Sequence, residues 1–99
     1  MRIAVYGRPF NDAAVLPYIQ QVFDNLSQHK VEIYVHHQLN KYLAGKINTV
    51  TYKVLKSNDQ IKDFIDLFIT LGGDGTLLDM VSVIRDSGVP VIGINFGRL

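Results

Sequence analysis

The fold of this 99-residue chain is decided by the stretch Leu67-Phe68-Ile69-Thr70-Leu71-Gly72-Gly73-Asp74-Gly75-Thr76. Its first half is a nearly continuous apolar run, which is typical of a strand buried on both faces of a parallel sheet. The strand, predicted over residues 66–71, runs directly into a turn with three glycines. Apolar residues at helical spacing follow, and Ser87 and Gly88 end this predicted helix. A strand, a glycine-rich turn and a helix in this order indicate an α/β fold.

The rest of the chain continues the alternation of strands and helices. Further strands are predicted at residues 2–6, 31–36, 48–55 and 90–94, helices at about 12–26 and 37–46, and a short amphipathic turn at 61–65 capped by 57–59. We therefore expect one parallel sheet with helices on its faces. Strand 31–36 has a more polar face and is expected to be less buried, strand 48–55 to lie at an edge, and strand 90–94 to be buried.

The first helix can begin at two places. If it begins near Leu16, Pro17 lies in the first turn, where its missing N–H costs nothing. If it begins at Asp12, with Asn11 or Asp12 as the N-cap, Pro17 should kink it. The spacing of the apolar residues allows both.

Composition excludes several classes of protein. The chain has 47% hydrophobic residues, 19% charged residues, a net charge of +1 and no cysteine. These values indicate one domain without a disulfide scaffold or a thiolate metal site, and without the basic surface of a nucleic-acid binder. The apolar start is too short for a signal peptide, and no window approaches the roughly 18 apolar residues of a membrane span. We expect a cytoplasmic domain with no nucleic-acid or membrane partner.

The glycine-rich turn is a candidate phosphate site. Ligands of open α/β sheets bind beyond the carboxyl ends of the strands, and this turn lies at such an end. Glycine at positions 72, 73 and 75 lets backbone N–H groups approach a ligand closely, and the helix from Thr76 adds its own free N–H groups and dipole. Next to phosphate, Asp74 would bind Mg²⁺ or accept a proton from an attacking hydroxyl. The alternative is that Asp74 only caps the helix.

Two segments resemble a known family. Residues 71–78, LGGDGTLL, are similar to the GGDGT signature of the superfamily that joins NAD kinases, diacylglycerol and sphingosine kinases and phosphofructokinases. Residues 93–99, GINFGRL, resemble the NAD kinase motif that follows the next strand. Lipid kinases usually continue the signature with Asn-Glu, whereas this chain has Leu77-Leu78. The resemblance is therefore to NAD kinases, and it implies a three-layer Rossmann-like parallel sheet.

The resemblance also implies roles for single residues. Asp74 would be the catalytic residue that takes the proton from the adenosine ribose 2′-hydroxyl of NAD as this oxygen attacks the terminal phosphate of ATP, or of polyphosphate. Gly75 would share the dinucleotide contact. The donor and its Mg²⁺ would be cradled by Gly72, Gly73 and Thr76, and the edge of the pocket would be lined by Asn95, Phe96 and the residues up to Leu99.

The family has a second, β-rich domain that completes its active site. Residues 1–99 would be the N-terminal α/β domain alone, with little or no activity without its C-terminal domain. NAD, ATP and this C-terminal domain would be its partners, in a protein that forms homo-oligomers. Two alternatives stay open, a lipid kinase of the same superfamily and a nucleotide-binding module without catalysis.

Four charged or titratable residues are given lesser roles. Arg8 follows the first strand and could contact phosphate, although a solvated loop arginine is the commoner situation. Relatives often have a basic residue at the position of Asp79, so no phosphate contact is expected there. Neighbouring residues on a strand point to opposite faces, so His36 and His37 should not share a metal ion. No metal-binding residue is predicted.

Overall fold

The computed structural model describes residues 1–8, 13–48, 51–56, 61, 63–84 and 87–96. Within these residues, five strands form one parallel sheet in the order β3-β2-β1-β4-β5. The strands are β1 (Arg2–Gly7), β2 (Glu32–His36), β3 (Lys53–Leu55), β4 (Leu67–Gly72) and β5 (Val91–Asn95). The predicted α/β fold with a parallel sheet is confirmed.

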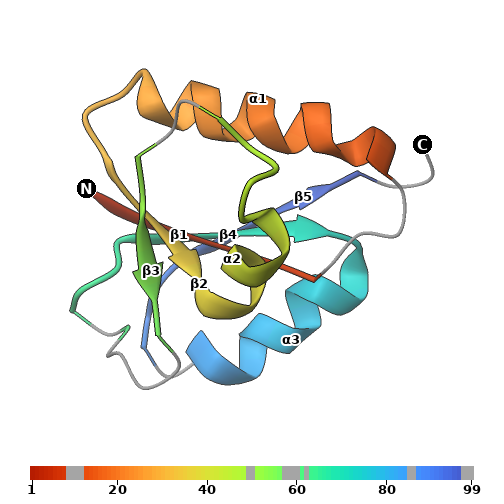
Figure 1. The fold of residues 1–99 in the computed structure, drawn as a ribbon. Helices are drawn as coiled ribbons and strands as arrows, with labels where there is room; N and C mark the ends of the chain where they lie inside the picture. Colours follow the sequence, from red (N-terminus) through yellow and green to blue (C-terminus); the bar gives the residue numbers. More distant parts are fainter. Residues whose placement is uncertain (9–12, 49–50, 57–60, 62, 85–86, 97–99) are drawn as a thin grey trace.

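The centre of the sheet is β1, which pairs with β2 on one side and with β4 on the other. The strand order runs outward in both directions from this strand, so the sheet reverses its winding between β1 and β4. In open α/β sheets a ligand crevice forms at such a reversal, beyond the carboxyl ends of the strands. Figure 1 shows these ends of β1, β4 and β5 on the side where the helix after β4 begins.

Helix α1 (Leu16–Ser27) follows a short 3₁₀ helix at Ala13–Val15. Pro17 lies in its first turn, as the later of the two predicted starts requires. The cap position is taken by Val15, and the expected caps, Asn11 and Asp12, lie outside the described residues.

Helices cover both faces of the sheet. Ile19 and Phe23 of α1 pack on one face, together with Leu39 and Leu43 of α2 (His37–Leu43). On the other face lies α3 (Asp74–Ile84), whose Met80 and Ile84 pack against β1 and β4 in the second core. Figure 1 shows α1 and α3 on opposite sides of the strands, so the domain has three layers.

One expectation about burial is confirmed and one is wrong. Strand β2, between β1 and β3, has three of its five residues buried, against five of six in β1 and four of six in β4, so it is the less buried strand, as expected. Strand β5 has β4 as its neighbour in the sheet, and its Ile92 is 51% exposed. The apolar sequence of β5 is compatible with burial, but the burial of a strand also depends on its position in the sheet.

The remaining predictions concern short segments. Strand β3 is at an edge, as expected, but has three residues. Residues 57–60 and 62, which include the expected cap, lie outside the described residues, and the neighbouring 63–64 form a turn in which Asp63 has a φ of 65°. None of the helices in the described part of the chain is long and apolar enough to cross a membrane.

Candidate functional site

The two segments that resemble the family motifs meet at the carboxyl edge of the sheet. In the register of β4 and β5, Gly72 lies beside Asn95. Since the glycine-rich turn follows Gly72 directly, the backbone of both segments borders the same crevice. Strand pairing therefore brings together Gly72 and Asn95, two predicted site residues that are far apart in the sequence.

The fold itself requires glycine at position 72. Its φ is 139°, which residues with a β-carbon rarely adopt, and a β-carbon there would lie 2.7 Å from the Thr76 hydroxyl oxygen. Thr76 is only 5% exposed, so its side chain has little room to move away. Gly72 and Thr76 thus shape the turn by packing against each other.

The first turn of α3 is closed by the carbonyl oxygen of Gly73. It accepts hydrogen bonds from the N–H of Thr76 at 3.1 Å and of Leu77 at 3.4 Å. Gly73 therefore precedes the helix, and Asp74 is its first residue. The side chain of Asp74 is not among those that the structure describes.

Gly73 has no such structural need for glycine. Its φ is not positive, and a β-carbon at this position would meet no atom within 4 Å. The space beside Gly73 is open. The first backbone N–H groups of a helix have no acceptor within the helix. The local structure therefore leaves room for a group that approaches the backbone here.

A guanidinium group lies beside this turn. Arg8, one residue after β1, donates two hydrogen bonds to the carboxylate of Asp79 on α3, from Nε at 2.6 Å and from Nη2 at 2.7 Å. The Tyr6 hydroxyl donates to the same carboxylate at 3.3 Å. The Asp79 carboxylate therefore joins α3 to the end of β1, through Tyr6 in the strand and Arg8 directly after it.

The ionisation of these three groups follows from their contacts. The hydrogen bond from Arg8 lowers the pKa of Asp79, and the hydrogen bond to Asp79 raises the pKa of Arg8. Burial raises the pKa of the Tyr6 hydroxyl, and the negative charge of Asp79 raises it further. Asp79 and Arg8 are both charged at neutral pH, and Tyr6 is a neutral hydrogen-bond donor.

Arg8 also approaches the glycine-rich turn. Its Nη1, the nitrogen that takes no part in the ion pair, lies 3.4 Å from the place of a β-carbon on Gly75. Arg8 is thus held in place by Asp79, although its side chain is 55% exposed. The sequence predicted that Arg8 follows the first strand, where it could contact phosphate, but it did not predict the pair with Asp79, because the hydrogen-bonded residues are 71 positions apart.

A cavity of about 570 Å³ lies next to this arginine. Its lining consists of Tyr6, Gly7, Arg8, Gln38, Lys41 and Tyr42. These residues come from the carboxyl end of β1 and from α2, so the cavity lies on the edge of the sheet where ligands of this architecture bind. It contains two cationic side chains, those of Arg8 and Lys41.

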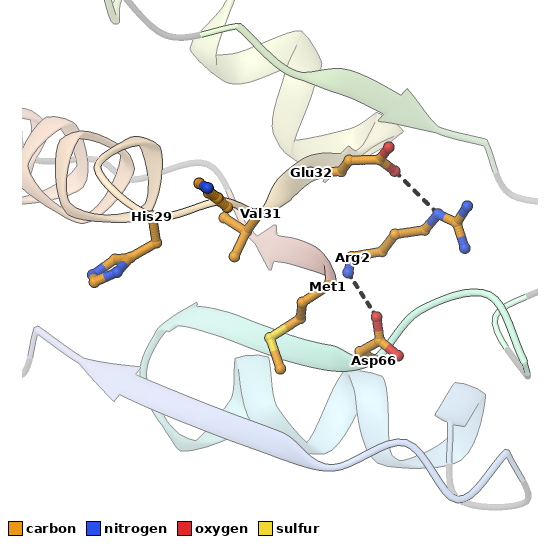
Figure 2. Close-up of a pocket in the computed structure, with 7 residues that line it drawn as sticks. Met1, Arg2, His29, Val31, Glu32 and Asp66 are labelled. Atoms are coloured by element: carbon orange, nitrogen blue, oxygen red, sulfur yellow. Dashed lines mark hydrogen bonds and ion pairs between the residues drawn. The ribbon is translucent and has the colours of Figure 1, made fainter.

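A second cavity, of about 520 Å³, lies at the opposite edge of the sheet. Figure 2 shows that it is built around the starts of β1 and β2, where Arg2 pairs with Glu32 at 3.0 Å and its N–H donates to Asp66 at 2.7 Å. None of the predicted site residues lines it. We place the candidate site at the carboxyl edge for this reason.

Asn95 and Phe96 have different surroundings. Asn95 ends β5 at the crevice and is exposed. The ring of Phe96 packs against the core on the α1 face, with its centroid 6.4 Å from that of Tyr18. Phe96 therefore has a packing role, and its part in ligand binding stays a prediction. Residues 97–99 lie outside the described residues.

His37 begins α2 and does not continue the strand, so the expectation that the side chains of His36 and His37 point to opposite faces of one strand is wrong. The rings of His36 and His37 are neighbours, with centroids 4.4 Å apart. His36 Nδ1 accepts a hydrogen bond from the N–H of Gln38 at 3.3 Å, and burial lowers the pKa of His36 to about 4. In the described part of the chain, no three metal-ligating side chains come together.

Known proteins resemble this chain over its whole length. A relative called NAD kinase from Flavobacterium johnsoniae is 34% identical over 100 residues, which cover all of this chain and 34% of the relative. Another, from Nitrosomonas europaea, is 33% identical over 97 residues, 98% of this chain and 31% of the relative. The chain thus spans about a third of the length of these curated relatives.

A solved structure shares the fold. The crystal structure of yeast NADH kinase complexed with NADH superposes with a TM-score of 0.74 at 20% identity, covering all of this chain and 30% of that one. The family model of the ATP-NAD kinase N-terminal domain matches residues 6–99, which include both segments at the crevice. Because this model covers nearly the whole chain, the chain belongs to the ATP-NAD kinase N-terminal domain family.

Proposed function

We propose that this chain is the N-terminal domain of an NAD kinase, which transfers the terminal phosphate of ATP to the adenosine ribose 2′-hydroxyl of NAD. The observation that carries the proposal is the juxtaposition of Gly72 and Asn95 beside the open start of α3. It unites the two segments that resemble the kinase motifs in one crevice. Family membership supports the same activity.

In the proposed reaction, Asp74 is the general base. Its carboxylate takes the proton of the 2′-hydroxyl while this oxygen attacks the terminal phosphorus of the donor. The bond between that phosphorus and its bridging oxygen breaks, and ADP leaves with the electron pair. The products are NADP, ADP and the proton on Asp74, which later passes to water. Because Asp74 is the first residue of α3, its backbone lies at the same helix end as the N–H groups that would bind the donor phosphates.

Backbone N–H groups at the start of α3 would bind the donor phosphates. Gly73 leaves open space where a side chain would exclude an oxygen atom, and Gly75 contributes to the dinucleotide contact. Gly72 and Thr76 act indirectly in this proposal, because they set the shape of the turn through their mutual contact. Asn95 and Phe96 border the crevice at the end of β5.

Mg²⁺ fits this site as a companion of the donor. Magnesium in proteins is commonly held by one or two carboxylates together with substrate phosphates. Here Asp74 and the phosphate oxygens of the donor would supply the coordination. When bound, the ion would neutralise charge on the transferring phosphate. Polyphosphate would be an equivalent donor in this arrangement.

The rest of the catalytic protein would lie outside this chain. The sheet order 3-2-1-4-5, with helices on both faces, supports a Rossmann-like fold, and the resemblance of residues 71–78 to the GGDGT signature supports the grouping with diacylglycerol kinases and phosphofructokinases. We propose that residues 1–99 form one α/β domain and that a β-rich C-terminal domain supplies the remainder of the dinucleotide site, in a cytoplasmic homo-oligomer. Relatives three times as long are consistent with this division.

The test is an NADP-forming assay on a fusion of this domain to the C-terminal two thirds of the Flavobacterium johnsoniae relative. Asp74→Asn should lower turnover by roughly 10²–10⁴-fold, as loss of a general base does, and leave NAD binding intact. The matched control is Asp63→Asn, an exposed residue whose positive φ suits asparagine. The isolated chain should show no turnover.

The outcomes separate the alternatives. A nucleotide-binding module would bind NAD in the fusion without forming NADP, with or without Asp74. A lipid kinase would phosphorylate diacylglycerol or sphingosine in place of NAD. Full turnover by the Asp74→Asn fusion would contradict the assigned base, and turnover by the isolated chain would contradict the need for a second domain.

A further inference from the structure

Arg8 is the charged side chain that connects the glycine-rich turn to the neighbouring cavity. It lines the cavity with Lys41, and its Nη1 faces Gly75 at the start of α3. The two other nitrogens of the guanidinium are taken by the Asp79 carboxylate. One edge of the guanidinium is therefore fixed to the protein, and Nη1 lies beside the start of α3.

The guanidinium of Arg8 passes close to Gly75. A β-carbon at Gly75 would lie 3.4 Å from Nη1, at the short end of ordinary van der Waals contact. Glycine at this position therefore leaves the guanidinium room beside the start of α3. Guanidinium groups held in this way bind phosphate oxygens with geometric specificity as well as charge.

We propose that Arg8 binds the polyphosphate group of the phosphoryl donor and bridges the glycine-rich turn and the cavity, while Asp79 acts as a positioning residue that holds Arg8. The inference rests on the proposed function, since it names a side chain that binds the phosphoryl donor. The proposal also gives a role to the acidic residue at position 79. Arg8, at the end of β1, brings a positive charge to the turn, and the Asp79 carboxylate on α3 orients the Arg8 side chain.

Inorganic tripolyphosphate is the probe, because it carries the shared chemistry of ATP and polyphosphate and requires neither NAD nor turnover. Binding to the 99-residue chain is followed by titration calorimetry and by the NMR signals of the Arg8 Nε–H and the Gly75 amide. Arg8→Gln should weaken binding about tenfold through loss of a charge-assisted contact. The control is Arg2→Gln, which removes the same charge and breaks a similar exposed ion pair, with Glu32, at the other edge of the sheet. It should bind as the unaltered chain does.

The role of Asp79 is tested by a double-mutant cycle. If Asp79 holds Arg8, Asp79→Asn weakens binding when Arg8 is present. In the Arg8→Gln background, the same change removes only a negative charge, so binding is unchanged or tighter. Tighter binding in both backgrounds would show that Asp79 merely repels the anion and would overturn the positioning role.

ATP is titrated in parallel with tripolyphosphate. Tighter binding of ATP identifies a nucleotide donor and equal binding an inorganic one, and in both cases loss of affinity in Arg8→Gln supports the inference. No binding by the unaltered chain, or equal weakening by Arg2→Gln and Arg8→Gln, overturns it. A failure to form NADP in the fusion assay would reject the proposed reaction and leave this binding result unaffected, so the two failures are distinguishable.

Discussion

At the scale of single residues, Gly72 and Gly73 are adjacent in the sequence and differ in what they do. Gly72 has a φ of 139° and leaves no space for a β-carbon beside Thr76, whereas Gly73 borders open space. The backbone conformation requires glycine at position 72, whereas glycine at position 73 leaves space for a ligand. A motif of consecutive glycines therefore combines a folding requirement with a binding requirement.

Alanine at each position should separate these requirements. Gly72→Ala should lower the free energy of unfolding by roughly 2–4 kcal/mol, because it adds backbone strain and an overlap with Thr76. Gly73→Ala should change stability little but weaken tripolyphosphate binding, since its methyl group would occupy the open space. Urea unfolding and titration calorimetry measure the two effects. Equal destabilisation by both changes would contradict this division.

His36 predicts how stability depends on pH. Burial, and then the nearby His37, lowers its pKa to about 4 in the folded protein, against about 6.5 in an unfolded chain. Between these values the unfolded state binds more protons, so stability is complete above pH 6.5 and falls as the pH drops toward 4. The loss should reach about 1–2 kcal/mol, because solvent screens a half-buried ring.

Urea unfolding at pH 7.5 and pH 5 measures this loss. His36→Asn removes the titrating ring and keeps a side chain suited to capping α2, so it should flatten the dependence on pH. His29→Asn, on the exposed turn after α1, should retain it. An unchanged pH dependence in His36→Asn would contradict the assignment.

At the scale of elements, two isoleucines that face each other in neighbouring strands differ in burial. Ile69 of β4 pairs with Ile92 of β5, yet Ile69 is 6% exposed and Ile92 is 51% exposed. Threonine keeps the branched shape in both strands. Ile69→Thr should cost about 2–3 kcal/mol through lost apolar contacts and a buried hydroxyl, and Ile92→Thr about 0.5 kcal/mol or less.

Thermal and urea unfolding of the two variants compare these costs. The pair is its own control, because the substitution and the secondary structure are the same. A large loss in Ile92→Thr would mean that β5 is covered in solution, for example by a second copy of the chain.

The sequence predicted element type better than burial. The continuous apolar run before Gly72 and the helical spacing after it identified β4 and α3, because these patterns follow directly from the local backbone period. The exposure of β5 depends on its position in the sheet, and this position comes from tertiary packing. Position in a sheet cannot be deduced from the pattern of one strand.

At the scale of the whole molecule, the radius of gyration of 12.6 Å agrees with the value of about 13 Å for a 100-residue domain that folds independently. The motifs predicted that both segments lie at the carboxyl edge of the sheet, and the pairing of Gly72 with Asn95 brings their backbones together there. They could not show that Arg8 reaches Asp79 or that a cavity lies between β1 and α2. Such contacts join distant parts of the chain through side chains that obey no local period.

The central position of β1 also determines the order of events during synthesis. This strand emerges first, but it acquires its partner on one side only when β4 has been made, since Ile3 lies beside Leu67. At about 5–20 residues per second, the ribosome needs roughly 3–13 s to add the intervening residues. Throughout this interval one edge of β1 is unpaired and can join another strand. The speed of translation, and not the speed of chain collapse, therefore sets the moment at which the central pair of the sheet can form.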